Sequence, residues 1–146
     1  MKKKINEMTL RLPAISINES VARSVISAFV AGLDPTVEEL GDLRCAVSEA
    51  VTNCIVHAYQ GADPLHSYMY ISARLYDNRE FSVEISDNGC GISDLDGAMH
   101  PGVSHGGDGE RCGMGFLVME SMTDGLKVKS SPGRGTTVLM KKFLSP

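Results

Sequence analysis

The spacing of apolar residues changes along this chain from a helical period to a strand period, and that change limits its possible folds. Within residues 18–58 apolar side chains recur three or four positions apart, which predicts two amphipathic helices. Residues 36–39 have the spacing of a capping box, so the second helix is expected to begin there. Residues 71–75 and 81–85 alternate apolar with polar side chains and predict two strands, joined by a tight hairpin at 77–79.

The remaining segments complete a mixed order of elements. Residues 8–12 alternate as a short strand does, whereas residues 87–115 are rich in glycine and have almost no periodicity. A helical pattern follows over 116–122, and a final hairpin over 126–140 turns at 131–135. Its second strand faces the core with either Thr137 and Leu139 or Val138 and Met140. The order predicts an α+β fold, a two-layer sandwich with helices on one face of a mostly antiparallel, mixed sheet.

Size and composition predict a single domain over residues 1–146 and exclude several functions. Apolar residues make up 42% of the chain, the ordinary share for a soluble globular protein. The formal net charge is -4 and aromatic residues are few, which argues against direct nucleic-acid binding. No apolar run approaches the length of a membrane span, so we expect a cytoplasmic protein without membrane contact. The four cysteines have no zinc-ligand spacing, and no metal is expected on them.

Two polar residues of the second predicted helix lie four positions apart. Glu49 and Asn53 therefore share one face, beside the apolar stripe. A carboxylate can accept a proton, and an amide oxygen is a hard ligand suited to magnesium. The alternative is an ordinary solvated helix face.

Three further motifs suit a phosphorylated ligand. Asp87, Gly89 and Gly91 follow a predicted strand, where the carboxylate could accept a purine amine and the glycines admit a close backbone approach. The same residues would also make a plain turn. Residues 110–116 place glycines and an arginine at a helix start, which is an anion site, and residues 102–109 could form a lid over it or a simple loop. Thr136 begins the last strand with a hydroxyl, although threonine is also a common strand residue.

The order of these four motifs resembles that of the GHKL ATPase superfamily, whose nucleotide-binding fold is called the Bergerat type. Residues 48–53 (Ser-Glu-Ala-Val-Thr-Asn), 111–116 (Arg-Cys-Gly-Met-Gly-Phe) and 135–138 (Gly-Thr-Thr-Val) are similar to the small serine-kinase anti-sigma factors. Residues 18–23 and 29–36 are similar to the corresponding segments of the anti-sigma factors of spore-forming bacteria. Those anti-sigma factors act on a sporulation sigma factor of the sigma F type. Cys112 departs from the serine that is common in the family.

The resemblance implies a site for Mg²⁺ and ATP or ADP. Glu49 would be the catalytic base for a serine hydroxyl, Asn53 would hold Mg²⁺, and Asp87 would bind the adenine amine with Thr136. The residues implied to approach the nucleotide through loops and lid are Gly89, Gly91, Arg111, Gly113, Met114 and Gly115.

The resemblance also implies protein partners. Glu19 and Arg23 would contact an RNA polymerase sigma factor or its competitor, an anti-anti-sigma factor that is phosphorylated on serine. The chain would be a homodimer and a protein serine kinase. Three alternatives remain open: an anti-sigma kinase for a general stress sigma factor, a nucleotide-dependent sigma-binding module without kinase activity, and the catalytic domain of a sensor histidine kinase.

Overall fold

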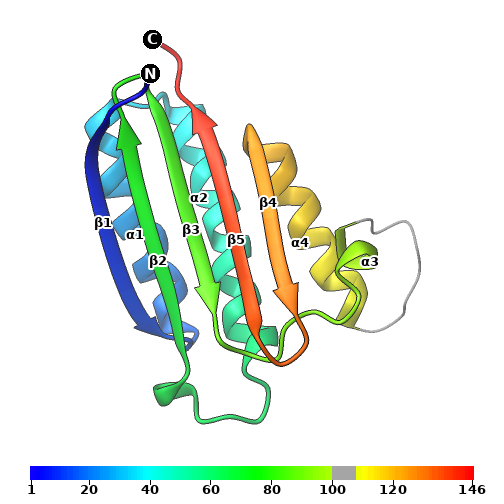
Figure 1. Cartoon of the computed structure of the whole chain (residues 1–146). Helices are drawn as coiled ribbons and strands as arrows, with labels where there is room; N and C mark the ends of the chain where they lie inside the picture. Colours follow the sequence, from blue (N-terminus) through cyan, green and yellow to red (C-terminus); the bar gives the residue numbers. More distant parts are fainter. Residues whose placement is uncertain (100–107) are drawn as a thin grey trace.

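One five-stranded sheet carries the long helices of the described chain on one of its faces (Figure 1). The computed structural model describes residues 1–99 and 108–146, without the side chains of residues 108–113. The strands are β1 (Lys4–Pro13), β2 (Tyr68–Tyr76), β3 (Glu80–Asp87), β4 (Gly125–Ser131) and β5 (Gly135–Phe143). The helices are α1 (Ile17–Val30), α2 (Val37–Asn53), α3 (Leu95–Met99) and α4 (Asp108–Met122), with short turns η1 (Ala31–Leu33), η2 (Cys54–Ala58) and η3 (Pro64–His66). The α+β two-layer prediction is confirmed.

The sheet order is β1-β2-β3-β5-β4, and all four pairings among these strands are antiparallel. The predicted hairpin joins β2 to β3, where Arg79 takes a positive φ of 67°. The segment containing α3 and α4 separates β3 from β4, and β5 then returns between them (Figure 1). This return brings the start of β5 beside the end of β3, since Ser86 pairs with Thr137.

The core lies between the inner face of the sheet and the helices. On β5 it is Val138 and Met140 that face inward, which settles the open alternative for the last strand. The largest fully buried side chains come from both layers: Ile26, Val30, Leu43, Val47, Val51, Met69, Ile71, Phe81, Ile85, Phe116, Met119 and Met140. Among the described residues, no helix is long and apolar enough to cross a bilayer.

The second helix begins as predicted and ends differently. Thr36 and Glu39 form the capping box, with each side chain accepting the other's backbone N–H at 3.0 and 2.9 Å. The predicted α-helix to Ala58 instead changes at Cys54 into the π-turn η2. The carbonyl of Ala58 accepts the N–H of Cys90 at 2.8 Å, so the last turn is fixed by the loop after β3. Such π-turns occur frequently at functional sites.

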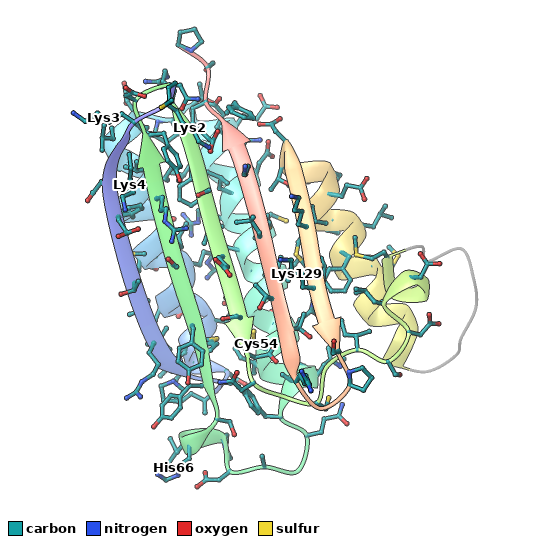
Figure 2. All side chains as sticks on the ribbon, viewed as in Figure 1. Lys2, Lys3, Lys4, Cys54, His66 and Lys129 are labelled. Carbon is teal, nitrogen blue, oxygen red and sulfur yellow. The ribbon has the colours of Figure 1, made fainter. Side chains whose placement is uncertain are left out.

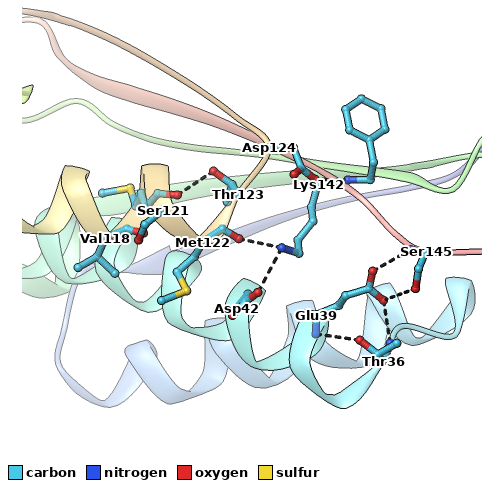
Figure 3. A network of polar contacts seen from close by, with 12 residues as sticks. Thr36, Glu39, Asp42, Val118, Ser121, Met122, Thr123, Asp124, Lys142 and Ser145 are labelled. Atoms are coloured by element: carbon cyan, nitrogen blue, oxygen red, sulfur yellow. Dashed lines mark hydrogen bonds and ion pairs between the residues drawn. The ribbon is translucent and has the colours of Figure 1, made fainter.

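Helix α4 is longer than the sequence indicated, because it begins at Asp108 and not at Phe116. Its glycines lower the intrinsic helix preference by about 1 kcal/mol each relative to alanine, which hides the helix from pattern analysis. Packing against α2 compensates. At its other end, the ammonium of Lys142 donates to the carbonyl of Met122 at 3.0 Å and to the carboxylate of Asp42 at 3.4 Å (Figure 3). The short helix α3 was not predicted, since five residues carry too little periodicity.

Candidate active site

A cavity of about 40 Å³ lies between the ends of α2, β3 and β5, with α4 closing one side. Four of the predicted residues line it: Asn53, Asp87, Gly91 and Thr136. The largely apolar walls include Ile85 and Phe116, and Phe116 is 1% exposed. A cavity of this size holds only a few waters, so a larger ligand requires the cavity to widen.

Asp87 is the buried carboxylate of this cavity. Its Oδ1 accepts the backbone N–H of Gly89 at 2.9 Å and that of Thr136 at 3.2 Å. Its Oδ2 accepts the thiol of Cys54 at 3.6 Å. Burial raises the pKa of Asp87, and the three hydrogen bonds oppose that rise because they favour the charged form. Three donors from different segments of the chain, Gly89, Thr136 and Cys54, therefore hold the carboxylate in place.

The two glycines after Asp87 are required by close backbone contacts. A Cβ atom at Gly89 would lie 2.2 Å from the carbonyl oxygen of Ala58. At Gly91, where φ is +73°, it would lie 2.1 Å from the carbonyl oxygen of Ser131. The loop after β3 is therefore pressed between η2 and the β4–β5 turn, which fixes the direction of Asp87. Both predicted glycines serve the architecture of the site, and their contact with a nucleotide remains a prediction.

Thr136 contributes through its backbone and its hydroxyl. The N–H binds Asp87, and the hydroxyl forms a 2.9 Å hydrogen bond with the hydroxyl of Ser130. Ser130 also accepts the backbone N–H of Ile92 at 2.7 Å, which connects the last hairpin to the glycine loop. Asp87 and Thr136 are therefore joined by a direct contact between β3 and β5, and their shared role in binding adenine remains a prediction.

Glu49 and Asn53 both lie beneath Gly115 of α4. A Cβ atom at Gly115 would be 3.2 Å from Oε2 of Glu49 and 3.6 Å from Oδ1 of Asn53. The Nδ2 of Asn53 is buried without a hydrogen-bond partner. A buried amide that lacks a partner is costly, so this side chain is suited to a polar ligand entering the cavity. The predicted stacking of the two residues on one helix face is present.

The predicted partner residues lie on the outer side of the helical layer. Arg23, Arg44, Ser48 and Glu49 line an open groove of about 500 Å³ between α1 and α2. Glu19 accepts hydrogen bonds from the Arg23 guanidinium at 3.1 Å and from the Ser48 hydroxyl. Nε of Arg23 is buried without a partner. Glu49 therefore lines this groove, whereas Asn53, one turn later, lines the cavity.

Several predicted residues fall at or beyond the limit of the described structure. Arg111 and Gly113 belong to α4, but the side chain of Arg111 is outside the description. The proposed lid, residues 102–109, lies almost entirely outside the described residues. Met114 is 54% exposed and does not line the cavity.

Three residues of the site were not predicted to have a functional role: one in the apolar stripe of the second helix, one at a helix start and one outside every motif. Cys54 was assigned to the apolar stripe, although its thiol reaches Asp87. Phe116 was only a helix start, and it walls the cavity. Tyr59 donates to the carbonyl of Tyr68 at 2.7 Å and accepts the N–H of Asn88 at 2.6 Å, which anchors the loop after β3. The position of Cys54 directly after Asn53 was the available signal.

The site suits magnesium only together with phosphate oxygens. Within residues 1–99 and 108–146 no group of three or more His, Cys, Asp or Glu residues could hold a metal ion. Mg²⁺ keeps several waters and binds through one or two protein oxygens plus phosphates. Asn53 can supply one such oxygen through Oδ1, and its unpartnered Nδ2 can donate to a phosphate oxygen of the same ligand.

Comparison with known proteins first defines the class. The family described as "Histidine kinase-like ATPase domain" matches residues 13–142. An "Anti-sigma F factor" from Shouchella clausii is 51% identical over 140 residues, covering 96% of this chain and 94% of the relative. One from Caldanaerobacter subterraneus is 47% identical over 139 residues, covering 95% and 94%. The chain belongs to the histidine kinase-like ATPase family and, within it, to the anti-sigma F factors.

Solved structures agree on the fold. The RsbU and RsbW domains of Rv1364c from Mycobacterium tuberculosis match with a TM-score of 0.71 and 18% identity, over 97% of this chain and 33% of that one. The histidine kinase domain of a blue-light activated kinase from Erythrobacter litoralis matches with a TM-score of 0.58 and 17% identity, over 86% and 61%.

Proposed function

We propose that this chain captures a sporulation sigma factor and uses MgATP to phosphorylate a serine of an anti-anti-sigma factor. The observation that carries this proposal is the position of Glu49 between two separate hollows. Glu49 lines the open groove between α1 and α2, and Asn53, one helical turn later, lines the cavity with Asp87. A protein in the groove and a nucleotide in the cavity would therefore meet beside Glu49.

The residues of the cavity suit an adenine nucleotide. Ionised Asp87 is an acceptor in the wall of the cavity, to which the 6-amino group of adenine can donate. The phosphates would then extend toward Asn53 and the first turns of α4, where Gly115 permits close approach. When bound, Mg²⁺ would neutralise charge on the phosphate oxygens, with Asn53 as its protein ligand.

Glu49 suits the role of the base. Glu49 lines the groove and its carboxylate lies beside Asn53 under Gly115, so it could accept the proton of a serine hydroxyl while that oxygen attacks the terminal phosphorus and ADP leaves. A nucleotide-binding module without transfer would not need a carboxylate at this junction.

The groove also suits protein capture. Arg23, which is ion-paired with Glu19, and the exposed Arg44 both line the groove, so its surface favours acidic or carbonyl groups of a protein partner. The formal net charge of -4 fits a protein partner better than nucleic acid. We propose that the chain acts in the cytoplasm as a homodimer; light scattering of the purified protein with and without ATP would test the dimer.

The decisive experiment mixes the purified chain with its cognate anti-anti-sigma factor and radiolabelled MgATP. Wild type should transfer label to serine. Glu49→Gln should keep nucleotide affinity and lose about 10²- to 10⁴-fold in transfer rate, the usual contribution of a general base. Glu120→Gln, exposed on α4, is the matched control and should behave as wild type.

Two outcomes would replace the proposal. Sigma capture without any phosphoserine would support the binding module, and full transfer by Glu49→Gln would remove Glu49 as the base. The sigma factor itself is identified by binding the chain, with MgATP, to purified sporulation and general stress sigma factors. Preference for the stress sigma factor would support that alternative.

A further inference from the structure

Cys54 has a polar contact that the proposed chemistry does not yet use. It is the first residue of the π-turn η2 and is 3% exposed, and Figure 2 shows it near the end of β3 that carries Asp87. Its Sγ lies 3.6 Å from Oδ2 of Asp87, and both residues line the cavity. Burial raises the pKa of the Cys54 thiol well above its ordinary value, so the thiol remains a hydrogen-bond donor at neutral pH.

The two oxygens of Asp87 differ in their surroundings. Oδ1 accepts two backbone N–H groups, from Gly89 and Thr136, and these contacts are fixed by the chain path. Oδ2 accepts the thiol of Cys54, a side-chain donor. An ionised carboxylate has only acceptor sites, so a ligand that contacts Asp87 must bring a donor of its own. The orientation of Oδ2 therefore decides how well a donor group of the ligand aligns with it.

We propose that Cys54 is a positioning residue for nucleobase selection. Its thiol holds Oδ2 of Asp87 so that the cavity accepts a 6-amino purine and rejects a 6-oxo purine. The inference rests on the proposed nucleotide binding and adds to it the residue that maintains selectivity. Without a donor at position 54, only Oδ1 remains held, by the backbone N–H groups of Gly89 and Thr136, and Oδ2 can shift out of alignment with the amino group. A 6-oxo group is an acceptor, so it is repelled by the carboxylate. That repulsion is weaker when Oδ2 is no longer aligned with the 6-position of the base.

The chain offers a closely matched pair of variants for the test. Cys54→Ala and Cys54→Ser leave nearly the same space, but only serine keeps a donor. Cys54→Val fills the space without a donor. Any effect of packing alone is thus shared by alanine and serine, and any effect of the donor separates them.

The experiment measures the affinities of ATP and inosine triphosphate, which differ at the 6-position of the base, by calorimetry with Mg²⁺. Wild type should prefer ATP by at least a hundredfold. Cys54→Ala and Cys54→Val should each reduce this ratio by about tenfold, mainly through weaker ATP binding, and Cys54→Ser should restore most of it. Both nucleotides are measured on the same preparation, so a partly unfolded variant still gives a valid ratio.

The outcomes distinguish this inference from the function on which it rests. A wild-type chain that binds neither nucleotide contradicts the proposed function. A wild-type chain that prefers ATP, with the same ratio in Cys54→Ala, overturns only the role of Cys54. Equal loss of the ratio in the alanine and serine variants would also overturn it, because packing and not the donor would then be the cause.

Discussion

Gly115 of α4 lies directly against the carboxylate of Glu49 in α2. A side chain at this position would begin 3.2 Å from Oε2 of Glu49, which is tighter than an ordinary contact. Asn53 lies under the same glycine, with Oδ1 at 3.6 Å from that position. The contact between the two helices is therefore also a contact between α4 and the two proposed functional residues.

Gly115→Ala should lower the affinity for MgATP without lowering the thermal stability of the fold. Alanine in place of a helix glycine raises helix stability by up to ~1 kcal/mol, so the melting temperature should not fall. The added methyl group would displace Glu49 or α4, and MgATP affinity should fall about tenfold, or ~1.4 kcal/mol. Gly41→Ala is the control, because nothing lies within 4 Å of its Cβ position. Unchanged affinity in Gly115→Ala would show that this contact lies outside the nucleotide site.

Asn53→Ala should abolish the magnesium dependence of nucleotide binding. Nδ2 of Asn53 has no hydrogen-bond partner in the fold, so its removal should leave the free energy of unfolding nearly unchanged. Affinity for MgATP should fall by about a hundredfold, or ~3 kcal/mol. Calorimetry with and without EDTA measures both effects. If EDTA weakens ATP binding equally in wild type and variant, Asn53 is not the magnesium ligand.

Arg23→Ala should weaken sigma capture without changing ATP affinity. Arginine is among the residues that dominate protein interfaces, and a loss of about tenfold or more is expected at such a position. Lys129→Ala is the control, since Lys129 is exposed on edge strand β4, away from the groove (Figure 2). Surface plasmon resonance with immobilised sigma factor, in saturating MgATP, gives the affinities of both variants and of wild type. An unaltered sigma affinity would place the docking surface elsewhere.

The sequence alone predicts the structure correctly where the local residue pattern and the chain topology favour the same element. The Thr36 capping box, the β2–β3 hairpin and the stacking of Glu49 on Asn53 follow from spacing alone, and all three are present. The predicted α4 was too short, because the low helix propensity of its glycines argues against a helix there. Packing against α2 supports the helix nonetheless. The π-turn at Cys54 depends on the N–H of Cys90, which is 36 residues away along the chain, and no local pattern indicates it.

Asp87 should give the folding stability a characteristic pH dependence. Burial raises its pKa in the folded chain above the ordinary value of 3.8, so in the interval above 3.8 the folded state binds more protons than the unfolded state. Stability from this group is therefore fully present below the ordinary pKa and is lost as pH rises through the raised pKa.

The matched comparison is wild type against Asp87→Asn, which has no titrating group at this position. The free energy of unfolding, measured in urea between about pH 4 and 7, should be obtained for both chains, because the other carboxylates then cancel. The difference, wild type minus variant, should be largest at the acid end and decrease as pH rises. A difference that increases with pH would mean that the bonds from Gly89, Thr136 and Cys54 outweigh burial, so that the pKa of Asp87 is lowered.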